Sequence, residues 1–198
     1  SPVNASSRTW AVTAAPRYPP EALTFLRALK RNNRREWFNA HREDYETRVK
    51  QPTLAIIERL ADDFREFAPE IVASPKSSMY RIYRDTRFSE NKTPYKTHIA
   101  ASFPTRGLPK GEGAGLYFHV ALDGVWIGGG IYAPPPPALY AIREHIAADT
   151  TPLRALGGSP GFRTVVGRIE GWKRQGGARG FPRGRACGGG PARKQVVG

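Results

Sequence analysis

The chain has 198 residues, of which 39% are hydrophobic, with a formal net charge of +14 and one cysteine. This length suffices for one domain with a hydrophobic core and is short for two. The single Cys187 excludes an internal disulfide and any multi-cysteine metal site, and no apolar run approaches the roughly 18 residues of a membrane-spanning helix. With no secretory signal pattern, these features predict a cytoplasmic protein without a membrane partner.

Residues 1–17 are expected to form a disordered leader. The next segment, PPEALTFLRALKRNN, begins with prolines and spaces its apolar residues as one face of an amphipathic helix: Ala22, Phe25, Leu26 and Leu29. Asn32 and Asn33 can end this helix, because asparagine tolerates the backbone conformation found at helix ends.

A second helix is predicted from about residue 34 to residue 50, with Trp37 and Phe38 near one face. Pro52 is expected to interrupt it, since proline lacks the backbone N–H that a helix interior needs. The apolar spacing then predicts a third helix that ends before Pro69.

The pattern changes to strand-like alternation after residue 75, in SSMYRIYRD and THIAASF. Two β-rich runs then flank Asp123-Gly124, a pair suited to a tight hairpin turn. Prolines 134–137 precede a helical pattern in ALYAIREHIAAD. This order predicts an α+β fold, with N-terminal helices packed on a central antiparallel sheet and a further helix after the sheet, in a single domain over residues 18–170.

Residues 171–198 form a Gly/Arg-rich tail that carries seven of the 31 basic residues and no acid, so it holds half of the net charge. Its composition predicts disorder. Because basic segments attract polyanions without specificity, nucleic acid is an alternative partner for this protein.

The segment MYRIYRDTRFSENKTPYKTHI, residues 79–99, concentrates basic and aromatic side chains. If residues 79–88 form one strand, Arg81 and Arg87 share a face where two guanidinium groups could clamp one phosphate or carboxylate. Asp85 could orient a neighbouring arginine through a charge-assisted hydrogen bond. Arg84 would then lie on the core-facing side with Phe88.

A core-facing Arg84 requires a carboxylate, a backbone carbonyl or a bound anion as its partner. In the loop beyond residue 88, Lys92 and Lys96 could close over the same anion. Pro94 stiffens this loop and lowers the entropy cost of holding Tyr95 in place, where it could stack on a ligand.

Three interpretations of the segment remain open. The leading one is a site for an anionic small molecule, bound by Arg81, Arg84, Arg87, Lys92, Tyr95 and Lys96. The second is an enzyme acting on a phosphorylated or carboxylated substrate, with Asp85 or His98 as the acid–base group. The third is a purely structural network of ion pairs with acids of the first helices, such as Glu36, Glu43 or Asp44. The sequence indicates no cofactor and no metal site, and it leaves the oligomeric state open.

The stretch RIYRDTRFSENKTPY carries the pattern R-x-x-R-D-x-R-F followed by K-x-x-Y, at Arg81, Arg84, Asp85, Arg87, Phe88, Lys92 and Tyr95. It resembles the bacterial conserved-hypothetical family known as domain of unknown function 2461. The segments FLRALKRNNRREWFNAHREDYETRVKQP and GGGIYAP look like the same family, so that the resemblance covers about residues 18–170. It implies no established activity.

The tail departs from the family pattern, which is expected to end in a short apolar helix. Here RGFP and RKQVVG flank residues without a helical pattern. Our hypothesis is a local reading-frame slip in the gene, so that residues 171–198 would be a frame-shifted family C-terminus rather than an RNA-binding tail.

Overall fold

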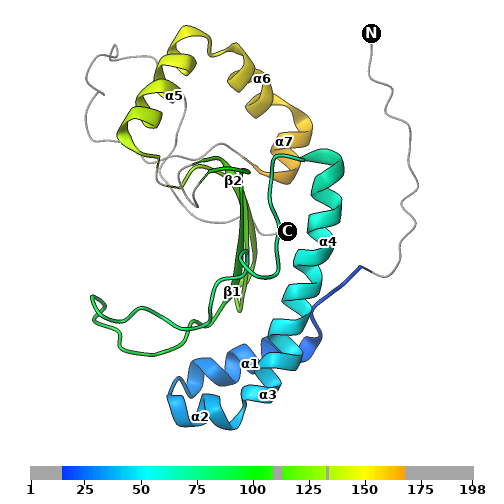
Figure 1. Ribbon diagram of the computed structural model, residues 1–198, viewed down its shortest axis with the longest axis vertical. Helices are drawn as coiled ribbons and strands as arrows, with labels where there is room; N and C mark the ends of the chain where they lie inside the picture. The colour runs from blue at the N-terminus through cyan, green and yellow to red at the C-terminus, as the bar shows by residue number, and fades with distance from the viewer. Residues whose placement is uncertain (1–14, 109–112, 133, 168–198) are drawn as a thin grey trace.

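The computed structural model describes residues 15–108, 113–132 and 134–167. Helices come first along the chain, a three-stranded antiparallel sheet follows, and further helices end the described part (Figure 1), which confirms the predicted α+β class. Most of the expected leader and all of residues 171–198 lie outside the described residues. Among the described helices, none has both the length and the apolar character needed to cross a membrane.

The first helix, α1 (Pro20–Arg31), forms as its pattern predicts. Its apolar face is buried, at Ala22, Phe25, Leu26 and Leu29. Asn32 ends the helix: its backbone N–H and its side-chain amide both donate to the carbonyl of Ala28, at 3.0 Å each. The asparagine pair therefore marks the helix end as expected.

The predicted helix over residues 34–50 is divided, and Pro52 does not interrupt the chain of helices. The helices α2 (Arg35–Ala40) and α3 (Arg42–Tyr45) lead into a π-helical turn, η1 (Glu46–Lys50), which runs directly into α4 (Gln51–Phe67). The wider turn accommodates the proline, which has no N–H to donate. The Thr53 hydroxyl donates to the carbonyl of Val49 at 2.7 Å and satisfies one of the acceptors at this junction.

The sheet has the order β1-β2-β3, formed by β1 (Ile99–Pro104), β2 (Gly115–Ala121) and β3 (Gly124–Gly130). The predicted hairpin is present, but its turn lies one residue earlier, at Leu122-Asp123, because Ala121 pairs with Gly124. Gly124 takes a φ of +141°, which explains the glycine at this position.

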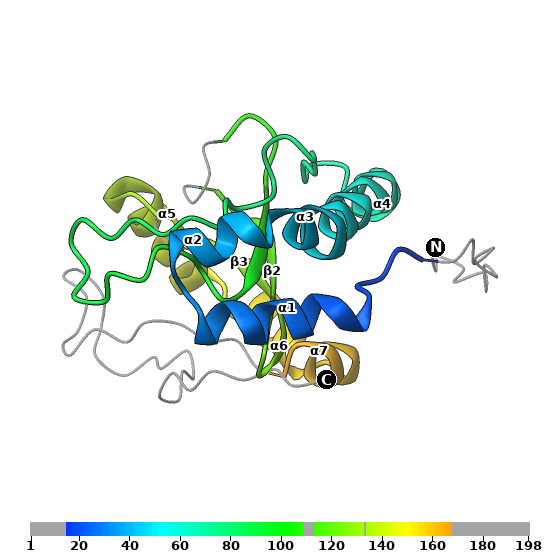
Figure 2. The same cartoon turned by 90° about the horizontal axis from the view of Figure 1, so that it is seen from below.

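The hydrophobic core lies between the N-terminal helices and one face of the sheet. Alternate residues of β1, namely Ile99, Ala101 and Phe103, point into it. In Figures 1 and 2, α3 and α4 lie on one side of the sheet and α5 (Pro136–Ala148) lies on the other. The opposite face of β1 carries the alternate residues Ala100 and Ser102.

The helix predicted after the sheet is α5, and two short helices follow it, α6 (Thr151–Gly158) and α7 (Pro160–Val165). None of the three contributes a buried side chain. They lie at the opposite end of the molecule from α1 and α2 (Figure 1), so the core depends on α1–α4 and the sheet.

Candidate functional site

The basic segment does not form one strand: one isolated bridge ties it to the edge of the sheet, and a second joins two parts of the segment to each other. Met79 pairs with Ala101 of β1, and Tyr83 pairs with Tyr95. Backbone bonds from Arg84 to Pro94, at 2.9 Å, and from Lys96 to Ile82, at 2.8 Å, close the base of a loop over residues 85–93. The strand-like pairing thus ends at residue 84.

The expectation that Phe88 faces the core is wrong. Met79 and Ile82 both pack into the core, so the strict alternation fails between them, and the Phe88 side chain is 95% exposed. A strand pattern holds only while a neighbouring strand supplies hydrogen bonds. Beyond residue 84 the chain leaves its partner and becomes a loop.

The base of this loop is anchored to the N-terminal helices through Asn33 and Tyr95. The Asn33 amide donates to the carbonyl of Tyr95 at 2.9 Å and accepts from its N–H at 3.0 Å. The Tyr95 ring is 3% exposed and stacks on Phe38, with centroids 4.2 Å apart. The structure places Tyr95, a predicted ligand contact, inside the core, where burial raises the pKa of its phenol.

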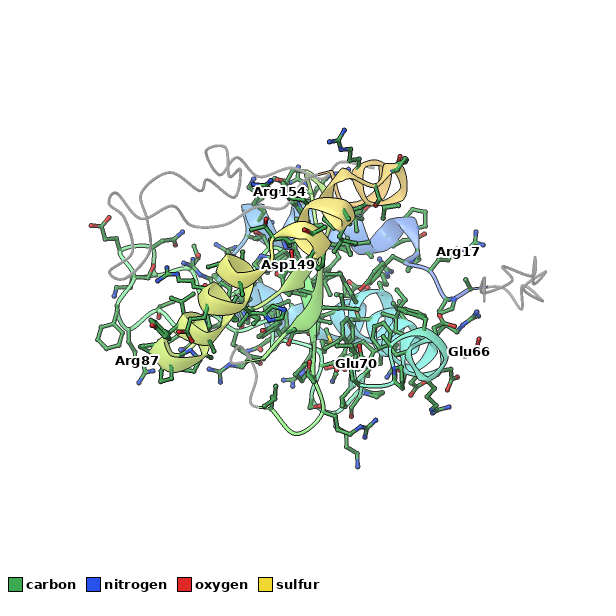
Figure 3. All side chains as sticks on the ribbon, turned by 90° about the horizontal axis from the view of Figure 1, so that it is seen from above. Arg17, Glu66, Glu70, Arg87, Asp149 and Arg154 are labelled. Atoms are coloured by element: carbon green, nitrogen blue, oxygen red, sulfur yellow. The ribbon has the colours of Figure 1, made fainter. Side chains whose placement is uncertain are left out.

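Three predicted ligand-binding cations have partners within the loop itself. Arg87 forms a two-pronged ion pair with Asp85, at 3.0 and 2.7 Å. Arg84 donates to the Thr93 hydroxyl at 2.5 Å, and Lys92 donates to the carbonyl of Thr86 at 3.0 Å. Arg87 lies at the outer edge of the molecule in Figure 3.

These contacts explain the electrostatics of Asp85. Its hydrogen bonds to the Arg87 side chain and N–H lower the pKa of the Asp85 carboxyl, because they favour the charged form. In the described residues, Asp85–Arg87 is the one ion pair of the basic segment. Asp44 pairs instead with Arg48, at 3.1 Å.

Arg81 and Lys96 differ from the other cations of the segment. The Lys96 ammonium donates to the backbone carbonyl of Arg81 at 2.9 Å and lies 5.5 Å from the centroid of the Tyr80 ring. Neither Arg81 nor Lys96 forms an ion pair with an acidic side chain among the described residues. Burial lowers the pKa of Lys96, and the charge of Arg81 lowers it further.

Lys96 opens onto a cavity of about 810 Å³ on the sheet face that points away from α4. Residues of all three strands line it, together with Tyr80 from the adjoining edge segment. Its remaining lining is apolar or glycine, and its polar lining consists of Tyr80, Lys96, His98, Ser102, Tyr117, His119 and Tyr132. Clefts of this size, mostly apolar with a few convergent polar groups, are typical of small-molecule sites.

Two histidines meet in the floor of this cavity. The His98 and His119 rings lie 5.5 Å apart, and the Tyr117 hydroxyl is 3.1 Å from Nδ1 of His119. Burial lowers the pKa of His98, and His119 and Lys96 lower it further. His98 is therefore held as a neutral imidazole near pH 7, a form that can accept a proton.

The structure thus separates the predicted site residues into two groups. Lys96 and His98 line the cavity, whereas Arg81 lines a second, smaller hollow of about 330 Å³ with Phe38 and Tyr45. Four others, Arg84, Asp85, Arg87 and Lys92, hold the loop, and Tyr95 lies in the core. Sequence reasoning missed Tyr80, Tyr117 and His119. The alternation of β2 was the available signal, since it places Tyr117 and His119 on the face opposite Phe118 and Val120.

Comparison with known proteins gives one match. The model of the family described as "Conserved hypothetical protein (DUF2461)" matches residues 21–186, which is most of the chain. Neither the curated proteins nor the solved structures contain a match. The functional argument therefore depends on the geometry of this chain.

Proposed function

We propose that this chain, which belongs to the DUF2461 family of conserved hypothetical proteins, binds a small anionic ligand at the cavity that Lys96 lines. The anionic group is a phosphate or a carboxylate. A cytoplasmic location and a small-molecule partner are part of the same proposal.

The observation that carries the proposal is the Lys96 ammonium, which lines the cavity and forms no ion pair with an acidic side chain among the described residues. Burial lowers the pKa of Lys96, and the charge of Arg81 lowers it further. Bringing like charges together and partly burying one of them costs free energy. A bound anion at Lys96 would offset both costs through a charge-assisted hydrogen bond.

Three other cations of the segment have a supporting role in this proposal. Each donates to a partner in the segment: Arg84 to the hydroxyl of Thr93, Arg87 to the carboxylate of Asp85, and Lys92 to the carbonyl of Thr86. These bonds shape the loop over residues 85–93, whose base positions Lys96. This part of the motif is structural, but its partners lie within the segment and are not the acids of the first helices that the sequence interpretation named.

The test is titration calorimetry with inorganic pyrophosphate, ribose 5-phosphate and citrate as probes. We expect one of them to bind with one-to-one stoichiometry, and Lys96→Met to weaken that binding at least tenfold. Lys92→Met is the matched control, because it removes an equal charge from the same segment outside the cavity, and it should change affinity less than threefold.

The proposal fails if none of the three probes binds at millimolar concentration. It also fails if a folded Lys96→Met protein binds as tightly as the parent, or if Lys92→Met loses as much affinity as Lys96→Met. Salt dependence distinguishes a nucleic-acid site. A polyanion contacting many cations would show affinity falling steeply with salt concentration, whereas a small ligand has a shallow slope.

A catalytic version of the proposal assigns the acid–base role to His98 rather than to Asp85. His98 lines the cavity with a lowered pKa, whereas Asp85 is exposed and occupied by Arg87. For a phosphorylated substrate that turns over, His98→Gln should abolish product release while binding persists. Asp85→Asn should retain both, and loss of turnover in Asp85→Asn alone would reject this assignment.

A further inference from the structure

We infer that the ligand carries a planar aromatic ring next to its anionic group, as a mononucleotide does, and that this ring lies over Gly128 beside Tyr117. This inference rests on the proposed function and specifies the chemical class of the ligand.

The first observation is the missing side chain at Gly128 in the lining of the cavity. Gly128 lies in β3 directly opposite Tyr117 of β2. A Cβ at Gly128 would meet no atom within 4 Å, so neither packing nor a close approach of the backbone requires glycine there. Its φ is not positive, so the backbone does not require glycine either.

Glycine in a strand interior has a cost, because it orders a flexible residue and supplies no side chain for packing. Gly130, which also lines the cavity, has a φ of +149° and therefore a backbone reason to be glycine. Gly128 has no such reason. Its one structural effect is to leave the strand without a side chain beside the Tyr117 ring. A planar group can cover this bare stretch of backbone.

The second observation is the arrangement of aromatic rings around this stretch. The Tyr80 and Tyr117 rings lie 6.4 Å apart at an angle of 62°. The Lys96 ammonium lies 5.5 Å from the Tyr80 ring, so the cation and the aromatic floor adjoin through one side chain. A ring stacked on Tyr117 with its phosphate at Lys96 has the layout of a compact mononucleotide.

The third observation is an unsatisfied hydroxyl in the same floor. Ser102 pairs with Tyr117 across β1 and β2 and lines the cavity. Its Oγ is buried and has no hydrogen-bond partner among the described residues. Buried polar atoms are rarely left without partners in folded proteins, and rotation of this hydroxyl toward the cavity would bring it to a ring nitrogen or exocyclic amine.

The experiment uses three probes with the full chain: AMP, ribose 5-phosphate and adenosine, each titrated by calorimetry. We expect AMP to bind at least tenfold more tightly than ribose 5-phosphate, because the latter keeps the phosphate and lacks the ring. We expect adenosine to bind detectably but more weakly than AMP. Equal affinity for AMP and ribose 5-phosphate would overturn the ring site while leaving the proposed anion site standing. If neither phosphate compound binds, the ring site is rejected, and the anion site is rejected with it when pyrophosphate and citrate also fail to bind.

Gly128→Val is the decisive variant, because it fills the bare stretch with a residue that favours strands. We expect it to reduce AMP affinity at least tenfold, leave ribose 5-phosphate affinity within threefold, and not lower the melting temperature. Ile127→Thr, on the opposite face of the same strand, is the control and should leave AMP affinity unchanged. Undiminished AMP binding by a folded Gly128→Val protein would overturn the inference.

Discussion

The side-chain amide of Asn33 forms both hydrogen bonds that a neighbouring strand would otherwise supply to Tyr95. It donates to the Tyr95 carbonyl at 2.9 Å and accepts from the Tyr95 N–H at 3.0 Å. One residue between α1 and α2 thereby fixes the backbone next to Lys96. The position of the candidate site is coupled to the N-terminal helices through this contact.

Asn33→Ala should destabilise the protein, because it leaves both backbone groups of Tyr95 without their partner. Each partly buried hydrogen bond contributes about 1 kcal/mol, so the free energy of unfolding should fall by roughly 2–3 kcal/mol in urea denaturation. Asn33→Asp keeps the acceptor and loses the donor, so its free energy of unfolding should lie between those of the parent and of Asn33→Ala. A loss of under about 0.5 kcal/mol in Asn33→Ala would contradict this account.

Asp85→Asn should have little effect on stability, although Asp85 stands at the centre of the most distinctive stretch of the sequence. Its ion pair with Arg87 lies on the surface, where water screens the charges. The melting temperature should drop much less than in Asn33→Ala. A larger drop would show that the loop over residues 85–93 carries more of the fold than its exposure indicates.

Ser102→Ala should stabilise the free protein, because it removes a buried hydroxyl that has no partner among the described residues. The free energy of unfolding should rise by about 1 kcal/mol, the order of the desolvation cost of such a group.

Ser78→Ala is the matched control for Ser102→Ala. The Ser78 hydroxyl is buried too, but it accepts a hydrogen bond from the Ser74 N–H at 3.0 Å. Its removal should lower the free energy of unfolding. If both serine variants shift stability in the same direction, the Ser102 hydroxyl has a partner in solution.

Stability should fall as the pH drops below about 6.5, partly because of His98. The pKa of His98 in the folded protein lies below its ordinary value of 6.5. Between these two values the unfolded chain binds more protons than the folded one, so the free energy of unfolding decreases as pH falls.

Urea denaturation at pH 7.5, 6.5, 5.5 and 5.0 measures this dependence in the parent and in His98→Gln. The variant should lose less stability across this range, because glutamine does not titrate. The exposed His145→Gln in α5 is the control and should follow the parent. A parallel decline in His98→Gln would assign the pH dependence to other groups.

The sequence predicted elements well where a local pattern and the tertiary contacts agree. The face of α1 and the hairpin of β2 and β3 belong to this class, since apolar spacing and turn residues determine both. The interruption predicted at Pro52 is wrong, because the π-helical turn that precedes it compensates for the missing N–H. Single-residue propensity does not reveal that turn.

The candidate site was only partly predictable. The basic motif drew attention to Lys96 and His98, and both line the cavity. Charge alone did not separate Lys96 from Lys92, because the difference lies in which carbonyl each ammonium reaches. The pairing register of the strands brings together Tyr117, His119 and Gly128. Local sequence patterns do not reveal that register.

The alternation of β1 has a consequence for how such a protein can diverge. The core contains one set of alternate residues, Ile99, Ala101 and Phe103. The cavity is lined by the other set, His98, Ala100 and Ser102. Substitutions at the second set can retune ligand preference with the interior left intact. A single inserted or deleted residue in this strand would exchange the two sets, placing a histidine in the interior and a phenylalanine in the cavity. New specificities can therefore arise here by replacement, and a change in strand length would remove fold and site together.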